Sequence, residues 1–242
     1  MPDSISPRPA TDPAQQEMIL AAVDKFLERD VAPYAHALEA KDEYPHEIVE
    51  RMKELGLFGA TIGEEWGGLG LDVSTYTKIV ERVSAVWMSV SGIFNSHLIM
   101  AAAVERFGTE DQKKRYLPRF ATGELRGGIA LTEPDAGTDL QGIRTRAEKS
   151  GDGYVLNGTK TWISNSIQGQ ILAVLTKTDL KAEPAHKGMS LFLVEKGDNF
   201  RVTRKLEKLG YKGIDSGELI LEDCVVCLLY TSDAADESWR VD

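Results

Sequence analysis

The residue types best suited to chemistry are concentrated in one segment, Ala130 to Gly142, which reads ALTEPDAGTDLQG. A strand-like run ends there in a turn rich in Gly, Pro and Asp. Gly137 has no Cβ, so its backbone can approach a ligand closely. The hydroxyls of Thr132 and Thr138, beside free backbone N–H groups, suit the polar edge of a ring or a phosphate group. The segment therefore indicates a ligand-binding loop, and the alternative is a plain β-turn formed by its two aspartates.

Two histidines are further candidates for a ligand contact. His97 lies in an apolar stretch with helical spacing, where a lone histidine is either a hydrogen-bonded core residue or a substrate contact. His186 stands with Lys187 and Gly188 in a polar loop before a strand-like run, where the alternative is a solvated loop. The residues alone leave both alternatives open.

The two cysteines, Cys224 and Cys227, form a CxxC pair. A single CxxC without a second cysteine pair or nearby histidines is poor support for zinc, and a redox pair normally opens a helix. The sequence therefore predicts no metal site. Two cysteines also exclude a disulfide framework and fit a reducing compartment.

Helical periodicity fills the first half of the chain. Apolar residues recur at helical spacing over residues 15–31, 45–55, 74–87 and 90–107. Pro33 is expected to end the first of these helices, and Ser74 to cap the third. Thr109 and Gln112 form a capping box that opens a further helix. The apolar stripes predict a helical core that must support the ligand loop.

After Gly127 the apolar period shifts toward two, which is typical of strands. Strands are expected over residues 129–132, 154–156, 161–164, 171–176, 189–194 and 218–221, and Asn157-Gly158 predicts a type I′ hairpin turn. The fold class is therefore α+β, with an N-terminal all-α helical domain followed by a small antiparallel β-barrel-like domain. We assign residues 1–13 to a disordered leader, 14–126 to the helical domain and 127–226 to the β domain.

The bulk composition narrows the function classes. The chain has 242 residues and a formal net charge of −10, which argues against general nucleic-acid binding because phosphate contacts need clustered Lys and Arg. No apolar run approaches the ~18 residues of a membrane span. The first residues lack the features of a secretory signal. We expect a cytoplasmic protein without a membrane span.

The thirteen-residue segment resembles the signature of the acyl-CoA dehydrogenases at every position. Other stretches resemble the same family in the same order, namely EEWGGLG from Glu64, GTEDQK from Gly108, KTWISN from Lys160, KLG from Lys208 and LILED from Leu219. The resemblance covers roughly residues 15–226. It implies an N-terminal α domain, a middle β domain and a C-terminal four-helix domain, with FAD between the last two and the acyl-CoA beside the flavin.

The resemblance also implies roles for individual residues. The backbone of Ile129, Ala130, Leu131 and Thr132 would run beside the flavin ring, with the Thr132 hydroxyl on its pyrimidine edge. Gly137 and Thr138 would lie at the phosphate-bearing tail, and Thr138 would also face the CoA. In the stretch Trp162, Ile163 and Ser164, the indole would pack against the flavin and the Ser164 hydroxyl would bind flavin N5, where many relatives have Thr. His97 would contact the acyl group, and His186 or Lys187 the CoA.

The chain departs from the family pattern after Val226. The string from Cys227 to Glu237 looks like a translated adapter read-through, so residues 227–242 are expected to be a non-native tail. The family's catalytic Glu usually lies in the C-terminal domain, and no Glu here matches it. Glu133 is not nominated as the base. The chain is thus expected to be a fragment that lacks the base.

The resemblance implies α,β-dehydrogenation of acyl-CoA thioesters, with electrons passed to an electron-transfer flavoprotein and a homotetramer or dimer in the full-length form. One alternative is a same-fold flavin oxidase or monooxygenase, in which reduced flavin meets oxygen. Another is an inactive fragment that binds FAD or CoA without turnover.

Overall fold

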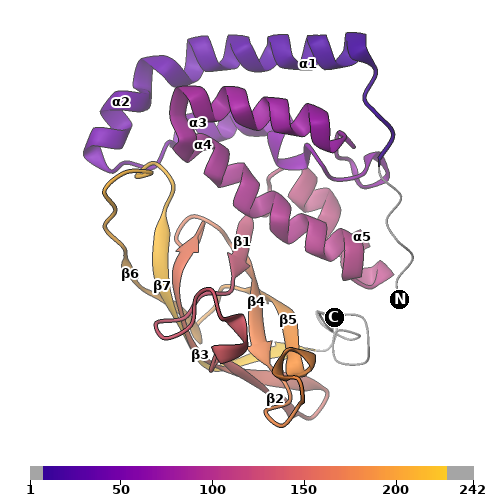
Figure 1. Ribbon diagram of the computed structural model, residues 1–242, viewed down its shortest axis with the longest axis vertical. Helices are drawn as coiled ribbons and strands as arrows, with labels where there is room; N and C mark the ends of the chain where they lie inside the picture. The colour runs from indigo at the N-terminus through magenta and orange to yellow at the C-terminus, as the bar shows by residue number, and fades with distance from the viewer. Residues whose placement is uncertain (1–7, 228–242) are drawn as a thin grey trace.

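Helices from the first half of the chain lie above a curled sheet from the second half (Figure 1). The computed structural model describes residues 8–227. The helices are α1 (Pro13–Phe26), α2 (Ala32–Lys41), α3 (His46–Glu54), α4 (Val73–Phe107) and α5 (Glu110–Ala121). The strands are β1 (Gly127–Ala130), β2 (Arg146–Ser150), β3 (Gly153–Ser164), β4 (Ile171–Lys177), β5 (Met189–Glu195), β6 (Phe200–Lys205) and β7 (Ser216–Cys227).

The expectation that Pro33 ends the first helix is wrong, because α1 and α2 form one continuous helical segment, which we call the α1–α2 rod. A π-helical turn, η1 (Leu27–Val31), joins α1 to α2, and Pro33 lies in the first turn of α2. Proline is tolerated there because the first N–H groups of a helix have no partner within the helix. The rod then ends at Asp42, which takes a left-handed conformation with φ 57°.

Helix α4 contains both helices expected over residues 74–107, which meet at a break, so their expected division is confirmed. Its cap is Asp72, whose carboxylate accepts hydrogen bonds from the backbone N–H groups of Ser74 and Thr75. A break with φ −157° and ψ 103° at Trp87 separates its two halves. By length and composition α4 is apolar enough to cross a membrane, but 61% of its apolar window is buried inside the protein. That burial is typical of a core helix.

Helix α5 begins where the sequence predicts. The capping box that opens α5 is confirmed: the Thr109 hydroxyl accepts from Gln112 N–H, and the Gln112 side chain accepts from Thr109 N–H.

Buried side chains of the helices form a single cluster that also includes Ile171, Ala173 and Leu193 from the sheet. The helical core therefore continues onto one face of β4 and β5. A second cluster fills the inside of the curled sheet.

The predicted helical part followed by a β part is confirmed, but the sheet is mixed rather than antiparallel. Its order is β1-β4-β2-β3-β7-β6, with β5 beside β4. β1 runs parallel to β4, with Gly127 opposite Ile171 and Ala130 opposite Val174. A parallel pair needs a long crossover, which the β2–β3 hairpin and its flanking loops supply between these strands.

The hairpin predicted at Asn157-Gly158 is wrong. β3 continues straight through these residues, and Gly158, with φ 155°, lies at a register shift against β7. A Cβ on Gly158 would come within 2.4 Å of the Thr145 hydroxyl oxygen, so close packing explains the glycine. The tight turn lies instead between Ser150 and Gly153, which pair across the end of the β2–β3 hairpin.

The ends of the described chain differ from the expected boundaries. Arg8 forms a two-pronged ion pair with Glu105, and Thr11 binds the Asp72 carboxylate, so residues 8–12 pack on the helices rather than forming a free leader. The backbone of Cys227 still pairs with Gly153 at the end of β7. The rest of the expected leader and tail, residues 1–7 and 228–242, lies outside the described residues.

Candidate functional site

The segment that follows β1 and the end of β3 meet side by side. The Thr161 N–H donates to the Thr132 carbonyl oxygen over 2.9 Å. Near the start of β1, a Cβ on Gly128 would lie 2.8 Å from the Ser164 carbonyl oxygen, so these backbones are in contact. The backbone segments that carry Thr132, Trp162 and Ser164 are therefore neighbours, and we call this strand edge the β1–β3 ledge. The sequence separates Thr132 from the other two by about thirty residues.

Trp162 is turned outward by an irregularity in β3. The register against β7 shifts between Lys160 and Ile163, and Trp162 takes φ 60°, a rare conformation for a bulky residue. Its side chain is 56% exposed, whereas the neighbouring Thr161 and Ile163 are buried. Strained backbone persists when the surroundings hold it in place, and it is concentrated at functional sites. The geometry presents an indole face to solvent.

Ser164 is fixed by the residue that follows it. Asn165, with φ 58° and 2% exposure, donates from Nδ2 to the carbonyl oxygens of Ile93 over 2.8 Å and Gly127 over 2.9 Å. One side chain thus joins α4, β1 and the end of β3. Sequence reasoning quoted Asn165 within a family-like stretch but gave it no role. Its signal is only that Asn tolerates the left-handed conformation.

The turn after Asn165 is held by Asp215. Its buried carboxylate accepts the N–H groups of Ile167 over 2.7 Å and Gln168 over 3.2 Å. Burial raises the pKa of Asp215, although the two N–H groups and nearby lysines favour its charged form. Asp215 was also missed, because nothing in the local sequence distinguishes it from a loop acid.

The base of the signature loop is closed by Glu133. Its carboxylate accepts the N–H groups of Arg144 over 2.6 Å and Thr145 over 3.0 Å, and pairs with Lys160 over 2.9 Å. Burial alone would raise the pKa of Glu133, but these hydrogen bonds outweigh it and hold the pKa below its ordinary value. Because its oxygens already accept hydrogen bonds within the protein and its pKa is low, Glu133 is unsuited to take a proton from a substrate.

The tip of the signature loop combines a β-turn with an exposed glycine and threonine, the two features that the sequence suggested. Glu133 and Ala136 close a tight turn, and Asp139 caps the short η4 (Leu140–Gly142), as expected of turn formers. Gly137 and Thr138 are exposed beyond this turn, and a Cβ on Gly137 would meet no atom of residues 8–227 within 4 Å. The protein's own packing therefore does not require glycine there, which leaves close approach by a ligand as a reason for it.

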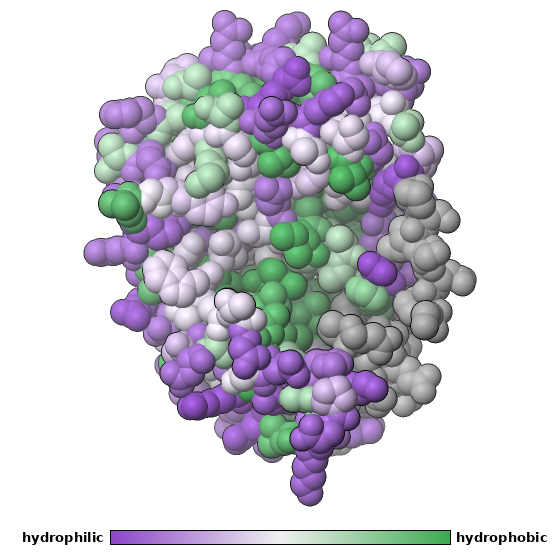
Figure 2. Space-filling model, viewed as in Figure 1, coloured by the Kyte–Doolittle hydropathy of each residue, from purple (hydrophilic) through white to green (hydrophobic). Residues whose placement is uncertain are grey.

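The other predicted site residues on β1 and β3 differ in the direction of their side chains. Ala130 and Ile163 are buried inside the curled sheet, so only their backbones face outward. Ile129 and Leu131 are half-buried and pack at the edges of the helical and smaller apolar clusters. Figure 2 shows hydrophobic side chains gathered in the middle of this face, over β1, β4 and β5. On these strands the apolar side chains of Ile129 and Leu191 are half-buried and the others are buried.

His97 is fully buried at the centre of the helical core. Its Nε2 lies 3.0 Å from the Phe120 carbonyl oxygen, its Nδ1 accepts from Gly127 N–H over 3.4 Å, and its ring packs edge-on against Phe58. Burial lowers the pKa of His97 to about 4, so the ring is neutral. This position matches the core-residue alternative. His97 lies behind the start of β1 and does not reach the exposed side of the ledge, so its substrate contact stays a prediction.

His186 lies on η5 (Ala185–Gly188), before β5, and is half-exposed. The adjacent Lys187 lines a cavity of about 490 Å³. Other cations in the lining are Arg146, Lys149 and Lys177, against the acids Glu148 and Asp179. The cavity is polar and carries an excess of positive charge, which suits a phosphate-bearing ligand.

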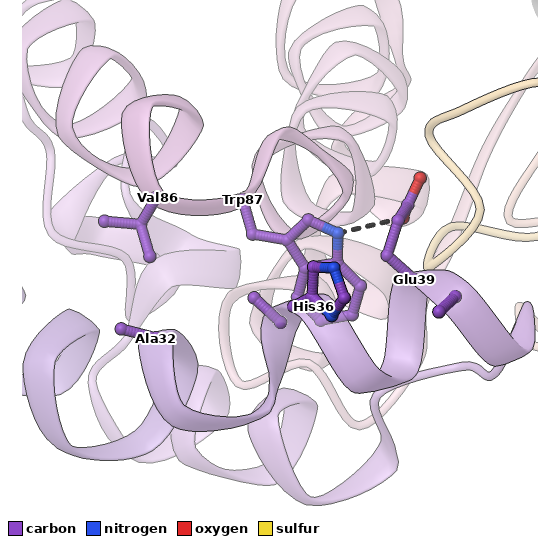
Figure 3. Close-up of a pocket in the computed structure, with 7 residues that line it drawn as sticks. Ala32, His36, Glu39, Val86 and Trp87 are labelled. Atoms are coloured by element: carbon purple, nitrogen blue, oxygen red, sulfur yellow. Dashed lines mark hydrogen bonds between the residues drawn. The ribbon is translucent and has the colours of Figure 1, made fainter.

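A second cavity, of about 460 Å³, lies between α2 and the break in α4, far in sequence from the signature loop (Figure 3). Its lining is Ala32, Ala35, His36, Glu39, Ala40, Val86 and Trp87. Glu39 accepts from the Trp87 indole over 2.9 Å, and its pKa is lowered because hydrogen bonds outweigh the opposing effect of burial. Its acceptor capacity is used within the protein, which favours a structural role.

Within residues 8–227, no group of three His, Cys, Asp or Glu side chains is placed to hold a metal ion. Cys224 is buried and has a pKa raised by that burial, so it is not a reactive thiolate.

Comparison with known families bears on this geometry. A model described as the acyl-CoA dehydrogenase N-terminal domain matches residues 13–124, and one described as the middle domain matches residues 128–224. The chain belongs to the acyl-CoA dehydrogenase family. The resemblance seen in the sequence is therefore confirmed, and the β1–β3 ledge lies in the middle domain.

Several relatives carry informative descriptions. The chain is 37% identical to mitochondrial isovaleryl-CoA dehydrogenase of Pongo abelii over 216 residues, covering 88% of this chain and 51% of the relative. Butyryl-CoA dehydrogenase of Megasphaera elsdenii has a TM-score of 0.84 at 31% identity, over 89% of this chain and 57% of that one. An acyl-CoA dehydrogenase of Bacillus anthracis, described as complexed with FAD, has a TM-score of 0.80 at 34% identity, over 90% and 38%. The chain spans about half the length of the curated relatives it matches.

Proposed function

We propose that this chain supplies the N-terminal and middle domains of an FAD-dependent acyl-CoA dehydrogenase, which converts acyl-CoA thioesters to trans-2-enoyl-CoA. The observation that supports the proposal is the β1–β3 ledge, where the backbone of Thr132 pairs with the end of β3 that carries Ser164 and the exposed Trp162. FAD, when bound, supplies an acceptor at flavin N5 for the hydride that leaves the thioester.

The residues present fit a flat ring with polar edges. Thr132 and Ser164 are half-exposed, so their hydroxyls are available as hydrogen-bonding groups. Trp162 excludes water from one side, because its indole is large and mostly apolar. The backbone from Ile129 to Leu131 forms the rest of the surface on which the ring would lie. Gly137 and Thr138, exposed at the loop tip, are assigned to the phosphate-bearing tail of the cofactor.

The substrate assignment rests on complementary charge. The lysine-lined cavity beside His186 suits the phosphates of CoA, and Thr138 would face the same molecule.

Removal of the α-proton of a thioester needs a positioned base. Glu133 is engaged in the loop base, so we propose that the carboxylate comes from a further part of a longer protein. The chain by itself should then be a poor catalyst.

The partners and location follow from the same proposal. Electrons would pass to an electron-transfer flavoprotein, and the full-length form would be a homotetramer or dimer. A cytoplasmic location remains our proposal from the sequence, supported by the content of only two cysteines.

The test is FAD binding, followed by anaerobic addition of butyryl-CoA. The 242-residue chain should retain FAD, as seen in its absorbance, and Trp162→Ala should weaken binding while Val225→Ala, an exposed change on β7, should not. A longer form carrying the base should bleach on addition of thioester and be reoxidised by an electron-transfer flavoprotein. Rapid oxygen consumption would favour the oxidase alternative. Failure of both forms to bind FAD would overturn the proposal.

A further inference from the structure

Glu133 and Lys160 form an ion pair that is shut off from water. The Lys160 ammonium lies 2.9 Å from Glu133 Oε1, and the side chains are 0% and 5% exposed. Taking two charges out of water is expensive, and buried ion pairs can often be replaced by apolar side chains without loss of stability. Stability alone is therefore a weak reason for this pair, and what the two side chains hold in place is more informative.

The pair connects three pieces of backbone. Lys160 also donates to the Leu131 carbonyl oxygen over 2.9 Å, directly after β1. Glu133 accepts the N–H groups of Arg144 and Thr145, which closes the two ends of the signature loop on each other. Lys160 itself is the last regularly paired residue of β3 before the register shift that turns Trp162 outward.

The charge on Glu133 matters for this geometry. Oε2 accepts from Arg144, while Oε1 accepts from both Thr145 and Lys160, so every neighbour is a donor. A carboxylate is acceptor-only and satisfies all three, whereas an amide would place an NH₂ group against an N–H. The lowered pKa of Glu133 agrees with a permanently charged carboxylate. Burial lowers the pKa of Lys160, and the contact with Glu133 opposes that effect.

We propose that Glu133 and Lys160 are positioning residues for the ligand ledge, which set the loop bearing Gly137 and Thr138 against the irregular strand bearing Trp162 and Ser164. This inference rests on the proposed FAD site, because both side chains are buried and act through the backbone that they hold. Ligand-binding groups need support from packed and hydrogen-bonded neighbours, because misplacement by about 1 Å already weakens a site. The two ledge segments are far apart in sequence, and this pair is a direct tie between them.

The test uses the double variant Glu133→Leu/Lys160→Met in the 242-residue chain. Thermal unfolding, amide hydrogen exchange and FAD titration are measured together. We expect a lower thermal midpoint, because the N–H groups of Arg144 and Thr145 lose their acceptor. Exchange should be faster over residues 134–143 and 160–165 but not over β6, and FAD affinity should be weaker by about tenfold or more. The control is Arg204→Met/Glu218→Leu, which removes an exposed pair between β6 and β7 and should leave loop exchange and FAD affinity unchanged.

The outcomes separate the two proposals. Wild-type exchange and wild-type FAD affinity in a stable double variant would overturn the positioning role. If the double variant does not fold, Glu133→Asp, which keeps the charge but shortens the reach, should show the same faster exchange and weaker binding, and wild-type values would overturn the role. If neither the wild-type chain nor the longer form binds FAD, the proposed function fails, and the exchange rates of the loop amides then decide whether the pair positions the loop.

Discussion

The carbonyl oxygen of Ser164 lies against Gly128, at a place where a Cβ on that glycine would be only 2.8 Å away. The obstructing atom belongs to the backbone and cannot rotate aside. Gly128→Ala should therefore force the two strands apart, lower the free energy of unfolding by about 1–3 kcal/mol and displace Ser164. Urea unfolding measures the first effect, and FAD titration the second.

The matched control is Gly137→Ala, because a Cβ on Gly137 would meet no atom of the described chain within 4 Å. Its free energy of unfolding should stay within about 0.5 kcal/mol of the wild type. FAD affinity should nevertheless fall if the cofactor tail approaches this backbone as proposed. A stable Gly128→Ala chain with unaltered FAD binding would contradict the proposed contact between the ledge strands.

His97 should make stability fall in mild acid. Burial depresses its pKa from 6.5 to about 4, so the unfolded chain binds a proton that the folded chain resists. The folded state is therefore unpenalised above pH ~6.5, and stability is lost as the pH falls through that value toward ~4, by on the order of 3 kcal/mol. His97→Gln should flatten this part of the pH profile, while the exposed His36→Gln should leave it unchanged. Equal profiles for both variants would show that another group causes the loss.

Glu39 should be important for the loop between β6 and β7. Its carboxylate accepts from the Trp87 indole, the Ser89 hydroxyl and the N–H groups of Lys212 and Gly213. Glu39→Ala would leave these donors without their acceptor, so the free energy of unfolding should fall by about 1–3 kcal/mol or more. Urea unfolding followed by tryptophan fluorescence would measure it.

An exposed glutamate nearby provides the comparison for Glu39. Glu43 is 57% exposed and makes only a long ion pair, at 3.9 Å, with Lys41. Glu43→Ala should change the free energy of unfolding by less than about 0.5 kcal/mol. Similar losses for both variants would mean that the hydrogen bonds of Glu39 contribute nothing particular.

Ser164 should tolerate threonine better than alanine. Threonine keeps the hydroxyl and restricts its rotamer, so FAD affinity should be retained or improved. Alanine removes one hydrogen bond, and affinity should fall by about 2- to 10-fold. Both variants should unfold like the wild type because Ser164 is half-exposed. Identical FAD affinity and flavin spectra for both would argue against the assigned contact.

The sequence itself predicted the features that depend on neighbouring residues. The capping box at Thr109, the succession of helices and then strands, and the family signature are all local patterns, so they could be found without the fold. The signature loop was also identified as exposed backbone with polar side chains. Local rules gave wrong results at Pro33, which lies in the first turn of α2 after a π-helical turn. They also failed at Asn157-Gly158, where β3 continues with a register shift against β7 and Gly158 packs against Thr145.

The tertiary structure alone decided how distant segments meet. No local pattern reports that β1 lies parallel to β4, or that Asn165 joins α4 to β1. The outward turn of Trp162 depends on a register shift against β7. The lowered pKa of Glu133 depends on hydrogen bonds from Thr145 and Lys160, which lie further along the chain. Those relationships are set by packing and by the need to pair buried polar groups, which act between residues that the sequence keeps apart.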